Sequence, residues 1–245
     1  MSAATDRDLG QGSATPQARP AGPARWAPFV SFLIGLPAVL FALITWQVVD
    51  RGPLLGVDRD VSHALLHPDR ASELLADLGN VGVAVPALAV VLAYAALRGR
   101  ATGVDRWWAP PLAAAALMVV LPALVVPLKE WTGRHGTTAV PPGVGFFPSG
   151  HTATAMIAYG SGTLVLLPLL RTALARLAVV AVCCALVLAV SFGLVRRGYH
   201  WPLDVAASWC LGAVLLSLLY LFVAFLSRST RRSSSRTPSS RTGPS

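Results

Sequence analysis

The 245-residue sequence has few charged residues and few cysteines, and each shortage excludes a class of protein. Charged residues make up 13% of the chain, whereas hydrophobic residues make up 54%. Soluble globular domains are about a quarter charged, so this composition indicates a membrane protein. The three cysteines, Cys183, Cys184 and Cys210, lie inside apolar runs and lack the spacing of a disulfide framework or a metal site. We interpret them as small buried side chains.

The charge that is present is strongly basic, with a net charge of +9 and a pI near 10.7. Such a balance also occurs in nucleic-acid-binding proteins, whose basic residues gather on one face. In this sequence the basic residues lie at the ends of apolar runs and in the C-terminal tail. That distribution is a topology signal of membrane proteins, so we expect membrane lipids as partners and no nucleic acid.

Six apolar runs each approach the ~20 residues that cross a hydrocarbon core of about 30 Å. They cover residues 28–49, 78–97, 107–128, 152–170, 172–195 and 203–226. The predicted fold class is therefore all-α, a six-span transmembrane helical bundle that occupies residues 28–226 as one domain. The flanking segments are too rich in Ala, Gly, Pro, Ser and Arg to bury a core. We expect residues 1–27 to be a disordered N-terminal arm and residues 227–245 to be a disordered, Ser/Arg-rich tail.

Six spans put both termini on one side of the membrane. If that side is cytoplasmic, it holds 13 of the 20 lysines and arginines, whereas the other side holds 8 of the 11 acids. The positive-inside rule therefore predicts a multi-pass protein of the cell membrane with cytoplasmic termini. Two long segments, 50–77 and 129–150, then become extracytoplasmic. The first predicts short interfacial helices, and the second is long enough to be a functional loop.

The stretch 145–154, Gly-Phe-Phe-Pro-Ser-Gly-His-Thr-Ala-Thr, leads from this loop into the fourth apolar run. Ser149 is a typical helix N-cap, Gly150 lets a ligand approach the backbone, and His151 falls in the first turn. Free N–H groups and the positive end of the helix dipole make such a start suitable for binding phosphate. The alternative is an ordinary helix N-terminus, with His151 facing lipid headgroups.

Two further polar clusters fall on the same face by this topology. Residues 129–135 leave the third run, and residues 196–204 separate the last two runs. Histidines, a lysine and arginines that converge at three span ends would form an anion site. His200 and Asp204 are four positions apart, so the carboxylate can hold the imidazole in one tautomer and stabilise its cation.

Simpler explanations exist for several of these residues. Lys129, Arg196 and Arg197 lie at span ends, where long cationic side chains commonly reach toward the headgroups. Three other histidines are more typical of solvated loops than of ligands; they are His63, His67 and His135. Two histidines and one aspartate offer too few ligands at helical spacing for a metal ion, so we expect no metal site.

The order of the motifs resembles that of a known family. Pro-Ser-Gly-His at 148–151 enters a span, His-x3-Asp follows at 200–204, and a lysine at a span exit precedes both. This arrangement is similar to the type 2 phosphatidic acid phosphatase family, integral-membrane branch, whose soluble relatives are the vanadium haloperoxidases. The resemblance covers about residues 50–225. It implies an extracytoplasmic site, a lipid phosphate substrate, and neither a metal nor another cofactor.

By position, the resemblance also implies a role for each motif residue. His200 would attack phosphorus and form a phosphohistidine, Asp204 would orient it, and His151 would protonate the leaving oxygen. The backbone and side-chain groups that would hold the phosphoryl oxygens belong to Lys129, Ser149 and Gly150.

The sequence departs from the family at two arginines. Gly136 stands seven positions after Lys129, and Leu194 stands six positions before His200, where the family has arginine in both cases. Nearby arginines are expected to bind the phosphate instead; they are Arg134, Arg196 and Arg197. Because guanidinium groups stabilise a transferring phosphoryl group, their loss would be costly, and a degraded site is the alternative.

These patterns support three hypotheses for function. The first is a phosphatase that hydrolyses a lipid phosphate or pyrophosphate monoester. The second is an enzyme that keeps the phosphohistidine but passes the phosphoryl group to an acceptor other than water. The third is a non-catalytic membrane protein that binds a lipid headgroup. No feature of the sequence selects one lipid or one oligomeric state.

Overall fold

The computed structural model describes residues 27–234. The predicted N-terminal arm lies outside these residues except for its last position, and so does the predicted tail beyond Ser234. Within the described part of the chain the order is eight α-helices and one 3-10 turn, with no strand. These elements are α1 (Ala27–Val49), α2 (Leu54–Leu65), α3 (Arg70–Asp77), α4 (Val81–Ala101), α5 (Ala109–Thr132), α6 (Gly150–Leu166), the turn Leu167–Leu169, α7 (Ala173–Arg197) and α8 (Pro202–Ser234).

Six of these helices are long and apolar enough to cross a membrane: α1, α4, α5, α6, α7 and α8. The prediction of an all-α bundle with six spans is confirmed. Some ends differ by a few residues from the predicted ones. α5 continues to Thr132, so Lys129 belongs to its last turn. α4 begins only at Val81, because the Asn80 side chain caps it by accepting from the N–H of Gly82 at 3.0 Å.

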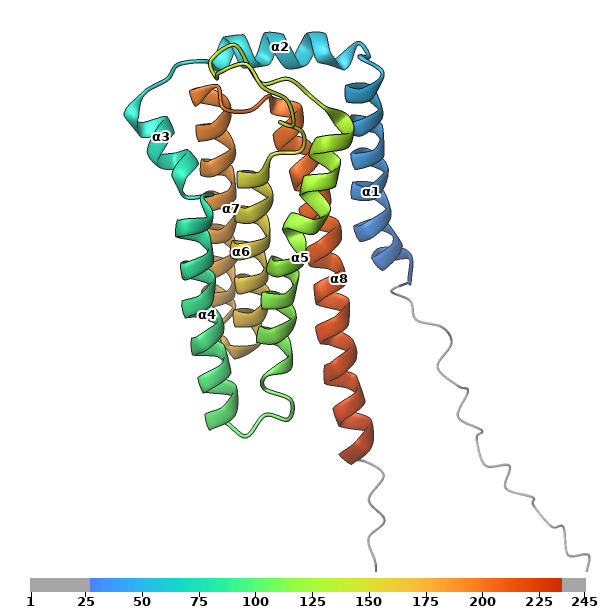
Figure 1. Cartoon of the computed structure of the whole chain (residues 1–245). Coiled ribbons are helices and arrows are strands. Elements are labelled where there is room, and N and C mark those ends of the chain that lie inside the picture. The colour runs from blue at the N-terminus through green and yellow to red at the C-terminus, as the bar shows by residue number, and fades with distance from the viewer. Residues whose placement is uncertain (1–26, 235–245) are drawn as a thin grey trace, which may run out of the picture.

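α6 is the central helix of the bundle, in contact with α4, α5, α7 and α8 (Figure 1). Of its apolar stretch 56% is buried, compared with 33% or less in the other spans. Small residues permit this packing, since a Cβ added at Gly160 would lie 2.4 Å from Leu216. Close contact at small residues is a common basis of helix association in lipid. The first turn of α6 is therefore held at the centre of one end of the bundle.

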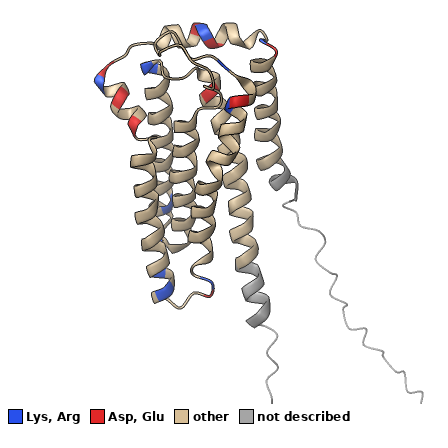
Figure 2. Cartoon of the chain, in the orientation of Figure 1, with Lys and Arg blue, Asp and Glu red and all other residues tan. Residues whose placement is uncertain are grey.

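Two short helices cover that end, which we call the site end. α2 lies across it, and α3 packs beside α7 (Figure 1). α3 begins with a capping box, in which Asp69 accepts from the N–H of Ser72 at 2.7 Å and donates its own N–H to the Ser72 hydroxyl at 3.1 Å. Most of the acidic residues gather at the site end (Figure 2). The helices predicted within 50–77 are present, and the side of the membrane on which they lie stays a prediction.

The loop between α5 and α6 folds back over the starts of the neighbouring helices. The N–H of Gly145 donates to the carbonyl of Arg134 at 2.9 Å, which closes the loop on itself. The indole N–H of Trp201 donates to the carbonyl of His135 at 3.1 Å, which joins the loop to the α7–α8 turn. These contacts bring the three polar clusters of the sequence to one place.

Candidate active site

The turn between α7 and α8 places His200 against Asp204. The turn follows Gly198, whose φ of 79° is the left-handed conformation that favours glycine. Nδ1 of His200 lies 3.1 Å from Oδ2 of Asp204, which also accepts from the N–H of Trp201 at 3.1 Å. An ionised carboxylate only accepts, so Nδ1 carries the proton and Nε2 keeps its lone pair. Both residues are buried, with 7% and 0% exposure.

Ser149 fastens the start of α6 to the start of α8. Its hydroxyl oxygen accepts from the N–H of Thr152 at 3.3 Å, so it is the N-cap that its residue type and position predict. Its own N–H donates to the carbonyl of Asp204 at 3.1 Å, and the Ser208 hydroxyl donates to its carbonyl at 2.8 Å. The second and third polar clusters therefore touch.

The backbone donors left at this helix start are the N–H groups of Gly150 and His151. Among the described residues neither of them has an acceptor, as expected for the first turn of a helix. The N–H of Ser149, which the family resemblance assigns to a phosphoryl oxygen, is already bonded to Asp204. The amides free to bind an anion are therefore one position further along the chain than expected.

Lys129 reaches the same helix start from the last turn of α5. Its Nζ donates to the carbonyl of Gly145 at 2.9 Å. A Cβ added at Gly150 would lie 3.9 Å from Cε of Lys129, so the glycine and the lysine are in contact. An ammonium group has three N–H donors, and two of them stay available here for an anion.

Arg134 lies in the loop beyond Lys129 and turns to two carboxylates. Its Nη1 donates to Oδ1 of Asp204 at 2.5 Å, and its Nη2 donates to Oδ2 of Asp58 on α2. Oδ1 of Asp58 accepts from the N–H of Leu203 at 2.8 Å. Burial raises the pKa of Asp58, and the charge of Arg134 and the Leu203 hydrogen bond oppose that effect.

Asp58 is a site residue that sequence reasoning missed. In α2 the apolar residues Val57 and Val61 are exposed, whereas Asp58 and Ser62 are buried. The usual expectation for a surface helix is the reverse, because apolar side chains are placed toward the core. The available signal was the spacing of the two polar residues, which lie four positions apart and so share one helix face.

The two other displaced arginines face α3. Nη2 of Arg196 lies 3.1 Å from Oδ2 of Asp69, and Nη2 of Arg197 lies 3.6 Å from Oε2 of Glu73. These ion pairs join the end of α7 to α3. All three displaced arginines thus have carboxylate partners, and their expected role in binding the phosphate stays a prediction.

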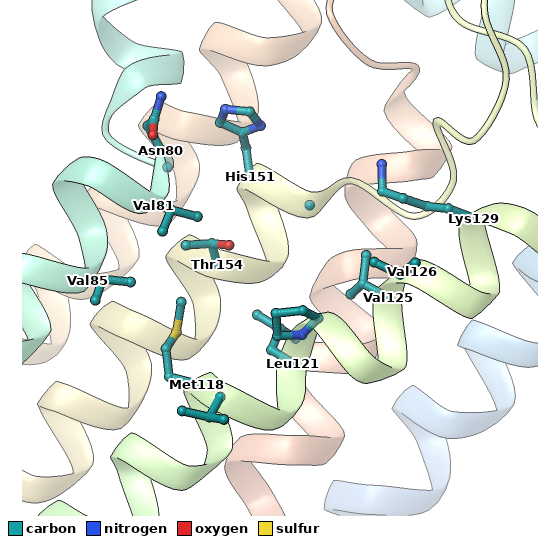
Figure 3. A pocket seen from close by; sticks show the side chains of 14 residues that line it. Asn80, Val81, Val85, Met118, Leu121, Val125, Val126, Lys129, His151 and Thr154 are labelled. Atoms are coloured by element: carbon teal, nitrogen blue, oxygen red, sulfur yellow. The ribbon is translucent and has the colours of Figure 1, made fainter.

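A cavity of about 560 Å³ opens beside the start of α6, between α4, α5 and α6 (Figure 3). Its rim is polar, with Asn80, Lys129 and His151 directed toward the site end (Figure 3). Below the rim its lining is apolar and comes mainly from α4 and α5; it includes Val81, Val85, Met118, Leu121, Val125 and Val126. None of the three displaced arginines belongs to the lining.

Asn80 is the second residue that sequence reasoning missed. Its Oδ1 is used to cap α4, which leaves the amide NH2 as a donor at the rim of the cavity (Figure 3). The turn before α4 also touches α6, because a Cβ added at Gly79 would lie 2.8 Å from the carbonyl oxygen of His151. Asn80 and His151 therefore belong to neighbouring segments of one rim.

The polar groups of the site suit an anion better than a metal ion. Residues 27–234 contain no group of three or more His, Cys, Asp or Glu side chains placed to hold a metal. The carboxylates of Asp58 and Asp204 are both paired with Arg134. Donors, by contrast, remain at Lys129 and at the start of α6, and phosphate oxygens accept strong hydrogen bonds from such groups.

One family model and one solved structure are similar to this chain. The family model of the PAP2 superfamily matches residues 112–228, which contain all three polar clusters. A similar solved structure is the crystal structure of a transmembrane PAP2 type phosphatidylglycerolphosphate phosphatase from Bacillus subtilis. The two chains are 20% identical, the likeness covers 79% of this chain and 96% of that one, and the TM-score is 0.65. No curated protein sequence matches the chain.

Proposed function

We propose that the chain is a member of the PAP2 superfamily, whose family model matches residues 112–228, and that it hydrolyses a lipid phosphate or pyrophosphate monoester through a phosphohistidine. One juxtaposition carries the proposal. His200 is oriented through Nδ1 by the buried Asp204, whose carbonyl accepts from the N–H of Ser149 at the start of α6. The free amides of that helix start and the ammonium of Lys129 are donors suited to an anion. The similar Bacillus protein is named for a lipid phosphate, which supports the same substrate class here.

In the first step Nε2 of His200 donates its lone pair to phosphorus, and the bond from phosphorus to the leaving oxygen breaks. His151 gives a proton to that oxygen, so the lipid product departs without a new charge. Asp204 stabilises the positive charge that develops on the imidazole ring. The ammonium of Lys129 and the N–H groups of Gly150 and His151 hold the phosphoryl oxygens.

In the second step a water oxygen attacks phosphorus, and the bond between phosphorus and Nε2 of His200 breaks. His151, which lost its proton in the first step, takes one from the water. Inorganic phosphate leaves, and His200 regains its lone pair. The cycle therefore returns both histidines to their starting protonation states.

The apolar cavity supports a substrate with a hydrocarbon chain. Along α5 the lining extends from Lys129 down to Met118, a rise of about 16 Å at 1.5 Å per residue. That depth is about half of a hydrocarbon core of ~30 Å, or one leaflet. A lipid with its phosphate at the rim would place its chain along Val85 and Val125 in the same cavity.

The direct test is phosphate release by the purified protein from a panel of phosphatidic acid, phosphatidylglycerol phosphate and an isoprenoid pyrophosphate. We expect turnover of at least one of them, and a loss of at least about 10³-fold in His200→Ala, because the nucleophile is gone. An acid-labile phosphoprotein should be trapped in the wild type and absent from the variant. Equal phosphate release by both proteins would remove the hydrolase proposal.

The site end is proposed to be extracytoplasmic, as the distribution of basic residues predicts. Val144 lies exposed in the α5–α6 loop and is suitable for a reporter cysteine. In intact cells Val144→Cys should react with a membrane-impermeant thiol reagent, and the wild type should not. Labelling only after the cells are permeabilised would place the site on the cytoplasmic side.

One observation favours a second candidate, a protein that binds a lipid headgroup without turnover. None of Arg134, Arg196 and Arg197 lines the cavity and each is paired with a carboxylate, whereas guanidinium groups that accelerate phosphoryl transfer contact the phosphate itself. Saturable binding of a lipid phosphate with no phosphate release would establish this candidate. A phosphoryl transferase would instead show release that depends on an added alcohol or phosphate acceptor.

A further inference from the structure

We propose that Asp58, on α2, is a positioning residue of this site, which acts on His200 through Arg134 and Asp204. The inference rests on the proposed function, because it assigns a role within the proposed reaction. It starts from a chain of contacts that crosses three segments of the protein. Asp58 accepts a hydrogen bond from Nη2 of Arg134, and Asp204 accepts one from Nη1 of the same arginine. The other oxygen of Asp204 contacts Nδ1 of His200.

Each oxygen of the Asp204 carboxylate has a fixed partner. Oδ2 accepts from Nδ1 of His200 and from the N–H of Trp201, whereas Oδ1 accepts from Arg134. The second contact of the guanidinium, with Asp58, fixes the plane of the arginine. Because a planar fork bonds two acceptors at once, its orientation sets the orientation of both carboxylates. Asp58 thus controls the direction in which Asp204 presents Oδ2 to the imidazole.

The charges of this cluster also suit the reaction. When ionised, Asp58, Arg134 and Asp204 together carry one net negative charge, and all three side chains are at least nine-tenths buried. An imidazole that attacks phosphorus develops a positive charge beside them, and buried charges act strongly on such a change. Without Asp58 the Arg134–Asp204 pair would be neutral, and the developing charge on His200 would be less stabilised.

A purely structural role is the competing explanation. Asp58 also accepts from the N–H of Leu203 at 2.8 Å, so it helps to hold α2 on the first turn of α8. Removing one partner of a buried ion pair destabilises a protein whether or not the pair serves catalysis. The test therefore needs readouts that a loss of stability alone would not change.

The first experiment compares Asp58→Asn with Asp60→Asn, an exposed aspartate on the same helix. The substrate is the member of the lipid panel that the wild type turns over. For Asp58→Asn we expect kcat on this substrate to fall by about tenfold or more, with KM changed by less than about threefold. The reason is that Asp58 and Arg134 act on the nucleophile, whereas the proposed phosphate donors lie at Lys129 and at the start of α6. Asp60→Asn should match the wild type. A rise in KM alone, or equal activity of the two variants, would overturn the positioning role.

The second experiment is a double-mutant cycle with Arg134→Gln. If Asp58 acts through Arg134, adding Asp58→Asn to Arg134→Gln should lower kcat by less than about twofold more. Arg134→Lys keeps the charge but has no fork, so it should not restore activity. If the two losses multiply instead, Asp58 acts independently of Arg134 and the proposal fails. Thermal unfolding of each variant shows how much folded protein contributes to each rate.

A third readout separates this inference from the proposed function. Orthovanadate forms a five-coordinate mimic of the phosphoryl transition state, and its binding needs an oriented nucleophile but no turnover. We expect Asp58→Asn to weaken vanadate binding by about tenfold and Asp60→Asn to leave it unchanged. A wild type that binds vanadate but hydrolyses no lipid would refute the proposed hydrolase, and the vanadate comparison would still decide the role of Asp58. A wild type that does neither would refute both.

Discussion

Two sides of the site use their polar groups in opposite ways. On the carboxylate side every charged group is buried and paired; its members are Asp58, Arg134 and Asp204. On the cavity side donors remain free at an open rim; its members are Asn80, Lys129 and His151. In the cluster the charges are paired with one another, which fixes the geometry beside His200, whereas the rim offers donors that no carboxylate holds. The proposed roles of positioning the nucleophile and binding the phosphate thus fall to different side chains.

Replacing His151 by Gln tests the cavity side where the largest effect is expected. The change removes the proposed general acid and keeps a polar side chain at the rim. On an alkyl phosphate we expect kcat to fall by about 10³-fold, because general acid catalysis contributes about 10²–10⁴-fold. An aryl phosphate, whose phenolate leaves without a proton, should lose less than about tenfold. The kcat values of both substrates in both proteins provide the measurement.

The ratio between the two substrates distinguishes chemistry from binding. If His151 only binds the phosphate, the alkyl and aryl substrates should lose activity equally. An equal loss would mean that both sides of the site serve only to position or bind groups, and the leaving group would need another acid.

The features that sequence reasoning predicted correctly depend on short stretches of chain. The six spans follow from the length and composition of each run, and the cap at Ser149 follows from its own residue type and position. The contact between His200 and Asp204 follows from a spacing of four across the start of α8. Each of these is set by residues that are neighbours in sequence, so no knowledge of packing was needed.

The partners of the arginines depend instead on how distant segments pack. Arg134 meets Asp58, 76 positions away, only because α2 crosses the site end. Arg196 meets Asp69 only because α3 docks against the end of α7. Leu194, at the position of an expected arginine, is fully buried in an apolar cluster and has no room for a charge. Single-sequence patterns contain no information about such docking, which is why Asp58 was missed.

A tryptophan at Val126 tests whether the apolar part of the cavity side receives a lipid chain. Val126 lines the cavity and is 48% exposed, whereas Val120, on the same helix and 47% exposed, does not line it. We expect Val126→Trp to lower kcat/KM for a long-chain lipid phosphate by about thirtyfold, since a misfit of one methylene in an apolar pocket already costs about 10–200-fold. A short water-soluble phosphate ester should be hydrolysed as before.

Val120→Trp provides the matched control, because it adds the same bulk to the lipid-facing surface outside the cavity. It should behave as the wild type with both substrates. Equal losses in the two tryptophan variants would mean that the cavity does not hold the chain. Neither change should alter the orientation of His200 by the carboxylate side, so both variants should bind vanadate with the affinity of the wild type.

Asn80→Asp tests whether the amide NH2 of Asn80, a neutral donor at the rim, binds the phosphate. Aspartate caps α4 as well as asparagine does, so the unfolding temperature should stay the same. The new carboxylate replaces a donor and repels the phosphate, and we expect KM to rise by about tenfold with a smaller change in kcat. Asn80→Ser keeps a cap without adding charge and should raise KM less. An unchanged KM in Asn80→Asp would remove Asn80 from the cavity side.

Asp69→Asn, at the start of α3 and outside both sides of the site, should give the smallest effect. The N–H and hydroxyl of Ser72, together with Arg196, lower the pKa of Asp69 from 3.8 to about 2. The ionised carboxylate therefore favours the folded state, and its contribution is complete above pH 3.8 and is lost as the pH falls through about 2. Asparagine keeps the cap but not the charge. The variant should unfold at a slightly lower temperature than the wild type at pH 7, and the difference should shrink as the pH approaches 2. Asp60→Asn is the exposed control, and a difference in unfolding temperature that is independent of pH would show that the charge of Asp69 does not hold α3.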